Sequence, residues 1–375
     1  MRRFQESDAA AVSRFNERME AGGTWHRLYE EDVAANPDAD LDLMPVYDSL
    51  FVAADGEEVR GGAWLREQYF WVDGERHRVG WIKYPVAESL IDPRYAGVPA
   101  SIVLQFLRHQ PQLMALGLGG HDAPFARLLS GIGWESSTVP FLFRIVRPFR
   151  VLRRLAHVRR RPWLRLVMDL AAWSGAGWIA HRVLHATSSP GSRSGSASTT
   201  PEARFSPWAD ATWETCRGSY AALALRDARA LDHVYPESSP DLHRLRVTRA
   251  GEDVGWVCAH VLPASPHNAR YFGDLRVGLL TEVLSAPEDA GRVLAEGVKH
   301  LERVGVDLVI GYFSHTVWIE AARRLRFLPG PSNFAFYRSP AANELFVGDA
   351  DLATRCHFTR YTFGEDVPVP DRPLS

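Results

Sequence analysis

The spacing of hydrophobic residues predicts a mixed α/β protein. Apolar residues recur at helical spacing between Ser7 and Glu20, which predicts an amphipathic helix near the N-terminus. Two apolar runs follow, Gly61–Val72 and Arg76–Tyr84. They flank Asp73-Gly74, a dipeptide that favours a tight turn between antiparallel strands. We therefore expect a hairpin at this point.

The remaining pattern alternates between the two kinds of element. In the first half it predicts a helix at 95–108, a strand at 113–118, a helix at 123–130 and a last strand at 138–146. In the second half it predicts a helix at 208–216 and two paired strands at 242–249 and 254–262.

One stretch of the chain occurs twice. Pro93 aligns with Pro287 and Gly97 with Gly291, at the same offset of 194 residues. This offset also places Glu88 on Glu282 without a gap. It continues to Leu116-Gly117 on Ile310-Gly311 and to Phe143-Arg144 on Tyr337-Arg338, with one residue of slippage around Trp134 and Phe327. We interpret the match as an internal duplication and expect residues 1–147 and 205–340 to superpose as one fold.

Composition narrows the class of protein. A length of 375 residues suggests two domains, and 46% hydrophobic with 23% charged residues is ordinary for a globular protein. The net charge of -2 gives no global sign of nucleic-acid binding. Three widely spaced cysteines argue against a disulfide framework or a thiolate zinc site and fit a reducing cytoplasm. The first residues lack the apolar region of a signal peptide.

The segment between the halves is strongly basic. Nine arginines and no acidic residue lie between Arg144 and Arg165, and Trp163, Trp173 and Trp178 lie at the end of this stretch or just after it. The longest uncharged run, 170–180, is shorter than the about 20 residues that span a bilayer. We expect a helical connector packed between the domains. The alternative is peripheral contact of 144–186 with an anionic membrane on the inner face. Nucleic acid is not expected, because no interleaved aromatics suit base stacking. Residues 187–200, rich in Ser and Gly, predict a flexible linker.

The order of these elements resembles the GNAT superfamily of acyl-CoA-dependent N-acyltransferases. The family's phosphate loop, Gln/Arg-x-x-Gly-x-Gly/Ala, is matched at its first and fourth positions by Arg94 and Gly97, whereas Pro99 at the sixth has no N–H. A later family pattern is echoed by Asp122, Phe125, Leu128, Leu129, Gly133 and Trp134. The runs 226–235 and 356–360 resemble GNAT-like proteins of bacterial envelope polysaccharide clusters.

The resemblance implies a mixed α+β protein with two tandem GNAT-like domains, 1–147 and 205–375, joined by a basic connector and linker at 148–204. It implies an N-acyltransferase that uses acetyl-CoA or another acyl-CoA, without a metal, on a small-molecule amine such as an amino sugar or envelope precursor. Two other functions stay open: an inactive tandem GNAT that serves as a binding or regulatory module, and a FemAB-like aminoacyl transferase.

The resemblance also assigns residues to roles. Acyl transfer to an amine needs a base for the amine and an acid for the leaving thiolate. The candidates for these catalytic roles are Glu88, Glu282 and Tyr337. The candidates for coenzyme A binding are Arg94, Ala96, Gly97, Val98, Ala100, Gly291 and Arg292. We expect the first half to hold the donor, because Glu288 and Asp289 would repel a phosphate at Gly291.

Overall fold

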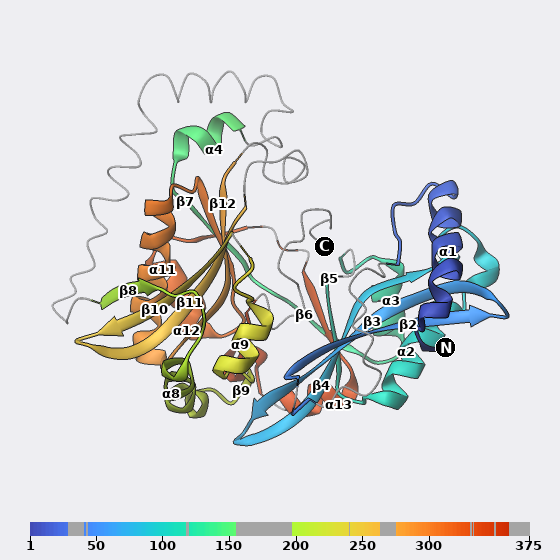
Figure 1. The fold of residues 1–375 in the computed structure, drawn as a ribbon, viewed down its shortest axis with the longest axis horizontal. Helices are drawn as coiled ribbons and strands as arrows, with labels where there is room; N and C mark the ends of the chain where they lie inside the picture. The colour runs from blue at the N-terminus through green and yellow to red at the C-terminus, as the bar shows by residue number, and fades with distance from the viewer. Residues whose placement is uncertain are drawn as a thin grey trace.

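The computed structural model describes residues 1–28, 41–42, 44–117, 120–154, 197–239, 241–262, 275–330, 332, 334–348 and 350–359. Within these ranges the chain is a mixed α/β protein with one nine-stranded and one seven-stranded sheet, and helices pack against both (Figure 1). Most of the basic connector and the start of the linker, 155–196, lie outside the described residues, so their expected structure stays a prediction.

The first sheet holds most of the N-terminal strands. Its path is β1 (Arg2–Arg3), β2 (Val46–Asp55), β3 (Glu58–Val72), β4 (Glu75–Ala87), β5 (Leu113–Gly117), β15 (Ala335–Arg338) and β6 (Glu135–Thr138). Two more strands from the second half extend it: β9 (Ala222–Ala224) pairs with β3, and β16 (Cys356–His357) pairs with β9.

The second sheet repeats the same order. Its path is β8 (Ala197–Pro201), β10 (Leu242–Arg249), β11 (Glu252–Leu262), β12 (Val277–Ser285), β13 (Leu308–Tyr312), β7 (Phe141–Ile145) and β14 (Leu328–Pro329). Every pairing in this path is antiparallel except that of β12 with β13. The parallel pair corresponds to β4 with β5 in the first sheet.

β7 and β15 each lie in the sheet that is built mainly from the other half. β7 of the first half pairs with β13 and β14, whereas β15 of the second half pairs with β5 and β6. The two strands occupy the same place in their sheets, so the halves exchange equivalent strands (Figure 1). The domain boundaries that we expected at 147 and 205 therefore do not separate the two sheets.

Turn chemistry accounts for both predicted hairpins. Asp73 and Gly74 have φ of 48° and 90°, and Ala250 and Gly251 have φ of 53° and 89°. Two successive residues with positive φ make the tight turn whose twist matches that of paired strands. Both hairpins are confirmed. The expected flexible linker is wrong at its end, because Ala197–Pro201 pairs with β10 as strand β8.

The described helices include the four that apolar spacing predicted, at Ala9–Ala21, Val98–His109, Pro124–Gly131 and Pro207–Cys216, and several that it did not. They are α1 (Ala9–Ala21), α2 (Val98–His109), α3 (Pro124–Gly131), α4 (Pro148–Arg154), α8 (Pro207–Cys216), α9 (Ala228–Val234), α11 (Ala290–Val304), α12 (Thr316–Arg324), α13 (Pro340–Phe346) and α14 (Leu352–Arg355). Short 3-10 turns occur at Glu6–Asp8, Glu88–Leu90, Pro93–Tyr95, Arg217–Ser219 and Pro287–Asp289.

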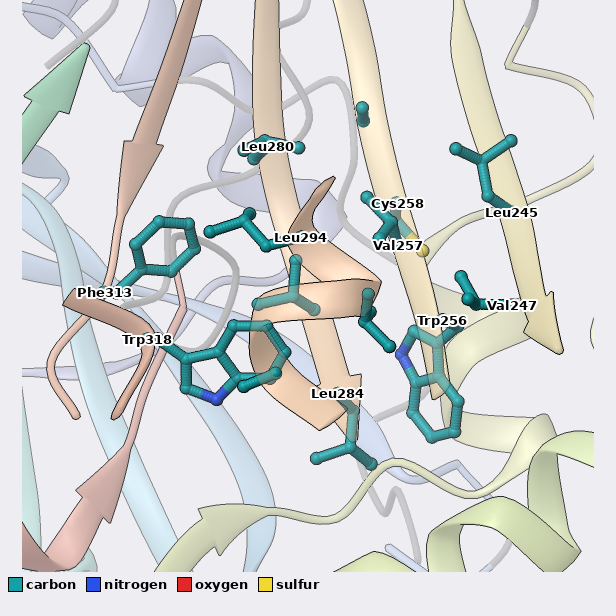
Figure 2. Packing of buried hydrophobic residues seen from close by; sticks show 14 of the residues in the cluster. Leu245, Val247, Trp256, Val257, Cys258, Leu280, Leu284, Leu294, Phe313 and Trp318 are labelled. Carbon is teal, nitrogen blue, oxygen red and sulfur yellow. The ribbon is translucent and has the colours of Figure 1, made fainter. Parts of the chain in front are cut away.

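The core of the second half lies beneath α11. Leu294 of this helix belongs to one buried cluster with Val257 and Leu284, and the fully buried Trp256 and Trp318 extend the cluster (Figure 2). Another cluster joins the sheets, because Trp81 of β4 and Phe336 of β15 share it with β12 and β13. The two sheets thus share this second cluster, which burial of nonpolar surface stabilises.

The second sheet repeats the strand order of the first, but the predicted offset of 194 residues does not align all of its strands. Gly61 pairs with Ala87, whereas Gly255, 194 positions later, pairs with Ser285 instead of residue 281. The two strands carry bulges at different points, since Tyr84 adopts φ of 48° in β4 while the irregularity in β12 lies near residue 281. An offset of 194 therefore misaligns β4 with β12.

Candidate functional site

The parallel strands of the first sheet separate after a short pairing. β4 and β5 pair only through Gly80–Ile82 and Leu113–Ala115, and β4 then continues to Ala87. None of the strands in the described ranges pairs with residues 83–87 on that edge. We call this opening, between residues 83–87 and 116–117, the first splay. α2 begins shortly after it at Val98.

The second sheet has the equivalent opening. β12 and β13 pair through Val277–Leu280 and Leu308–Gly311, after which β12 runs on to Ser285. We call the gap between residues 281–285 and 312–314 the second splay. The same arrangement of strand, turn and helix follows, with α11 in the place of α2.

A C-terminal segment fills the second splay. We call Cys356–Thr359 the strap. Thr359 forms a β-bridge with Phe313, and Ser314 N donates to Phe358 O at 3.2 Å. On the other side, His357 Nε2 lies 2.7 Å from the carbonyl oxygen of Val283 in β12. The strap therefore bridges both strands of this opening.

A buried ion pair anchors the strap. Arg226 Nε donates to Glu282 Oε2 at 2.9 Å, and the two side chains are each 3% exposed. Thr359 Oγ1 donates to the same carboxylate oxygen at 3.0 Å. Burial raises the pKa of Glu282, although Arg226 opposes that shift. Glu282 thus lies in a closed contact, which suits a structural role.

Aromatic rings pack around the strap. His357 stacks on Tyr220 and Trp318, with ring centroids 4.8 and 5.2 Å apart. Trp318 Nε1 donates to Tyr220 Oη at 3.0 Å, and that hydroxyl donates to Ser285 O at 2.9 Å. Burial lowers the pKa of His357 to about 3, so the imidazole is neutral at physiological pH.

The helix that follows the second splay already carries an anion at its N-terminus. Asp289 is the N-cap position of α11, and its Oδ1 accepts from Arg292 Nη1 at 2.6 Å and from Arg249 Nη1 at 2.9 Å. Arg292, expected to bind coenzyme A, is thus paired within the protein. Gly291 lies beside this ion cluster and is exposed. Arg249 and Arg292 thus both donate hydrogen bonds to Asp289.

The N-terminus of α2 offers a different surface. Gly97 is exposed at the N-cap position, no side chain of the described residues caps the helix, and a Cβ placed on Gly97 would meet no atom within 4 Å. Ala96 precedes it, while Val98 and Ala100 lie in the first turn, so these residues gather at one helix end as expected. N–H groups and the helix dipole there favour an anion.

Arg94 is directed toward its own turn. Its Nη2 and Nε donate to Asp92 Oδ2 at 2.6 and 2.9 Å, yet the arginine side chain remains 82% exposed. The hydrogen bonds from Arg94 lower the pKa of Asp92, which keeps this carboxylate ionised. This ion pair was not expected from the sequence.

Glu88 is held by two arginines. Its carboxylate accepts from Arg18 Nε at 2.9 Å and from Arg60 Nη1 at 3.0 Å, and the side chain is 6% exposed. Burial favours the neutral acid, but the two guanidinium groups together lower the pKa of Glu88. By strand pairing Glu88 follows Ala87, whose counterpart is Ser285, so its expected equivalence with Glu282 is wrong.

Tyr337 lies in the first sheet because of the strand exchange. It pairs with Ala115 of β5 and Ser136 of β6, and its ring is buried in the cluster under α2 and α3. Burial raises the pKa of its phenol, and a hydrogen bond with Ser130 partly offsets this rise. The His121 ring centroid is 6.3 Å away. The structure therefore places this candidate acid of the second half in the first sheet, not in the second.

A polar cluster near the first splay was missed at the sequence level. Arg66 Nε donates to Asp48 Oδ1 at 2.9 Å, and Lys83 Nζ lies 3.5 Å from Asp48 Oδ2. Lys83 pairs with Trp64 on β3, as Glu282 pairs with Cys258 on β11. Both halves thus hold an ionisable residue at this point of the sheet, but one is basic and the other acidic. Alternating polar residues in β3 were the available signal.

Other classes of site find no support in the described part of the chain. All three cysteines are buried free thiols. No group of three or more His, Cys, Asp or Glu side chains is arranged to hold a metal ion among the residues searched. In the same residues, none of the helices is both long and apolar enough to cross a membrane.

Neither a protein-family model nor a curated protein matches this chain. Three solved structures that align with this chain are described next. Saccharomyces cerevisiae N-myristoyltransferase with bound myristoyl-CoA aligns at a TM-score of 0.46 and 11% identity, over 76% of this chain and 64% of that one. A conserved protein of unknown function from Enterococcus faecalis, described as a probable N-acyltransferase, gives 0.45 and 11%, over 80% and 64%.

A GCN5-related N-acetyltransferase from Anabaena variabilis gives a TM-score of 0.46 and 12% identity, over 77% of this chain and 62% of that one. The chain spans less than two thirds of the length of these three structures. Such low identities and TM-scores carry no activity over to this protein.

Proposed function

We propose that the chain is a GNAT-type N-acyltransferase that binds one acyl-CoA in the first splay. The supporting observation is the contrast between the two splays. The second is bridged by the strap, and Asp289 occupies the anion-binding end of α11. The first has an uncapped α2 beside it and exposed Gly97 at the helix end. A pyrophosphate suits that end by charge.

In the proposed reaction the acyl-CoA thioester and the acceptor amine meet in the first splay. An amine nitrogen attacks the thioester carbonyl carbon, the C–N bond forms, the C–S bond breaks, and the coenzyme A thiolate takes up a proton while the nitrogen loses one. Tyr337 is the candidate acid, because the exchanged strand brings it beside β5 and α3. The acceptor is a small-molecule amine, and an amino sugar or envelope precursor is the proposed class.

One observation favours a second function, a binding module without catalysis. Both carboxylates expected to act as bases are tied to arginines: Glu88 to Arg18 and Arg60, and Glu282 to Arg226. An ion-paired carboxylate with a lowered pKa, such as Glu88, is a weaker base toward an ammonium group. Under this second proposal the first splay would still bind acyl-CoA, and no amide would form.

Thermal unfolding with acyl-CoA tests the binding step. A ligand at 100 times its Kd adds about 2.7 kcal/mol to the stability of the folded state. Acetyl-CoA or a longer acyl-CoA should therefore raise the melting temperature, and release of free thiol in the presence of amines should reveal transfer. A melting temperature that no acyl-CoA changes would reject both functions. Binding without thiol release would select the second.

A further inference from the structure

Gln68 is a buried side chain for which the described residues supply no hydrogen-bonding partner. It lies in β3, is 1% exposed, and neither its Nε2 nor its Oε1 makes a hydrogen bond within the described ranges. Buried amides are normally paired, because an unpaired donor or acceptor loses its hydration without compensation. A glutamine kept in this state points to a group that reaches it only in a complex.

Gln110 shows how the same residue type is satisfied elsewhere in the protein. It is 5% exposed, its Nε2 donates to Arg78 O at 3.1 Å, and its Oε1 accepts from Gln112 N at 3.1 Å. The two glutamines thus have similar burial and opposite hydrogen bonding. This makes Gln110 a matched control for Gln68.

Gln68 lies in β3 with buried apolar residues as its cross-strand neighbours and polar residues nearby on the same face. It pairs with Val46 of β2 and Val79 of β4, and Arg66 is two residues away on the same face of β3. Arg66 and Lys83 both contact Asp48 across these strands, and Lys83 is the first residue of the first splay. A line of polar side chains therefore runs from Gln68 toward the first splay.

The second half borders this line. Leu225 N donates to Tyr69 O, so the chain after β9 passes beside Gln68. α9 follows, and the pKa of its His233 is lowered by burial and by the charge of Arg66. The junction between the two halves is thus built from both, next to the first splay.

We infer that Gln68 binds an amide group of the acceptor. A carboxamide presents one acceptor and one donor side by side, and a primary carboxamide or a cyclic amide, whose N–H and C=O lie on the same edge, presents the complementary pair. A carboxylate would satisfy only Nε2 and leave Oε1 unpaired. The ligand class is therefore an amine that also carries a primary carboxamide or a cyclic amide. Naming this ligand the acceptor rests on the proposed function, whereas the amide-binding site itself does not.

Stability gives the first test. Gln68→Met keeps the size of the side chain and removes both unpaired polar atoms, so it should raise the melting temperature by about 2 °C or more. Gln110→Met breaks two hydrogen bonds and should lower it. If Gln68→Met lowers the melting temperature as Gln110→Met does, Gln68 has a structural partner and the inference is overturned.

Direct binding gives the second test. The side-chain amide signals of Gln68, assigned by their loss in Gln68→Met, are followed by NMR during titration with acetamide and with methyl acetate. The amide should shift these signals, and the ester, which lacks the N–H donor, should leave them in place. Equal shifts with both probes, or none with the amide, would contradict the site. Neither measurement uses acyl-CoA, so failure here is distinct from failure of the proposed transfer.

Discussion

Replacing Arg226 by methionine would leave Glu282 buried beside the strap without its counter-charge. Both side chains are 3% exposed and their charged atoms lie 2.9 Å apart. Removing one partner of such a pair costs about 3–5 kcal/mol, because the remaining charge stays desolvated. We therefore expect Arg226→Met to lower the free energy of unfolding by about 3–5 kcal/mol at pH 8.

The loss of stability in Arg226→Met should depend on pH in a defined direction. Burial already raises the pKa of Glu282 above 4.5, and without Arg226 it rises further. A carboxyl whose pKa is higher in the folded state than in the unfolded state stabilises the fold at pH values below its unfolded pKa. This stabilisation is lost as the pH rises through its folded pKa. The deficit of Arg226→Met should therefore shrink as pH falls from 8 toward 5.

Urea unfolding followed by tryptophan fluorescence measures this effect. The control is the double variant Arg226→Met with Glu282→Leu, which buries neither charge and should recover much of the stability lost by the single variant. A loss below about 1 kcal/mol, or a deficit that is the same at pH 5 and pH 8, would refute the claim that this buried pair anchors the strap.

Three further predictions concern the candidate residues. Arg18 and Arg60 lower the pKa of Glu88 in the folded state despite its burial, so the free energy of unfolding of the wild type should fall as pH drops below about 4.5. Urea unfolding of Glu88→Gln should show a smaller fall over the same pH range. Tyr337→Phe should lower kcat for thiol release by about tenfold or more while the Kd for acyl-CoA stays constant, and an unchanged kcat would remove Tyr337 as the acid. Burial lowers the pKa of His357 to about 3, so acidification from pH 6.5 to pH 3 should lower the free energy of unfolding by up to about 5 kcal/mol. Hydrogen exchange at the Ser314 and Phe358 amides should speed up over this range. Constant protection of these amides would contradict the prediction.

The local elements followed from the sequence because their causes are local. Asp73-Gly74 and Gly251 set their hairpins through positive φ, and the helices followed the spacing of apolar residues. The strand exchange did not follow, because β7 and β15 are both short and apolar. Such a strand satisfies the pattern equally well in either sheet, and only tertiary packing selects its partner.

The site was predictable only in part. The helix end at Gly97 was found because a glycine before a helix is a local signal. The pairs Arg226 with Glu282 and Asp48 with Arg66 join residues that lie 56 and 18 positions apart, and no spacing rule brings them together. Bulges at different points of β4 and β12 also shifted Glu88 away from Glu282, which an alignment without gaps could not show.

Calorimetric titration of acyl-CoA into the wild type, Gly97→Glu and Gly291→Glu tests the central claim most directly. Both glycines are exposed, and a Cβ on either would meet no atom within 4 Å, so both variants should fold. A carboxylate near 4 Å from two phosphate charges costs about 1 kcal/mol for each in water, or about thirtyfold in Kd. We predict one site per chain, weakened about thirtyfold in Gly97→Glu and unchanged in Gly291→Glu. Two sites, equal losses in both variants, a larger loss at Gly291, or no binding by the wild type would contradict the account.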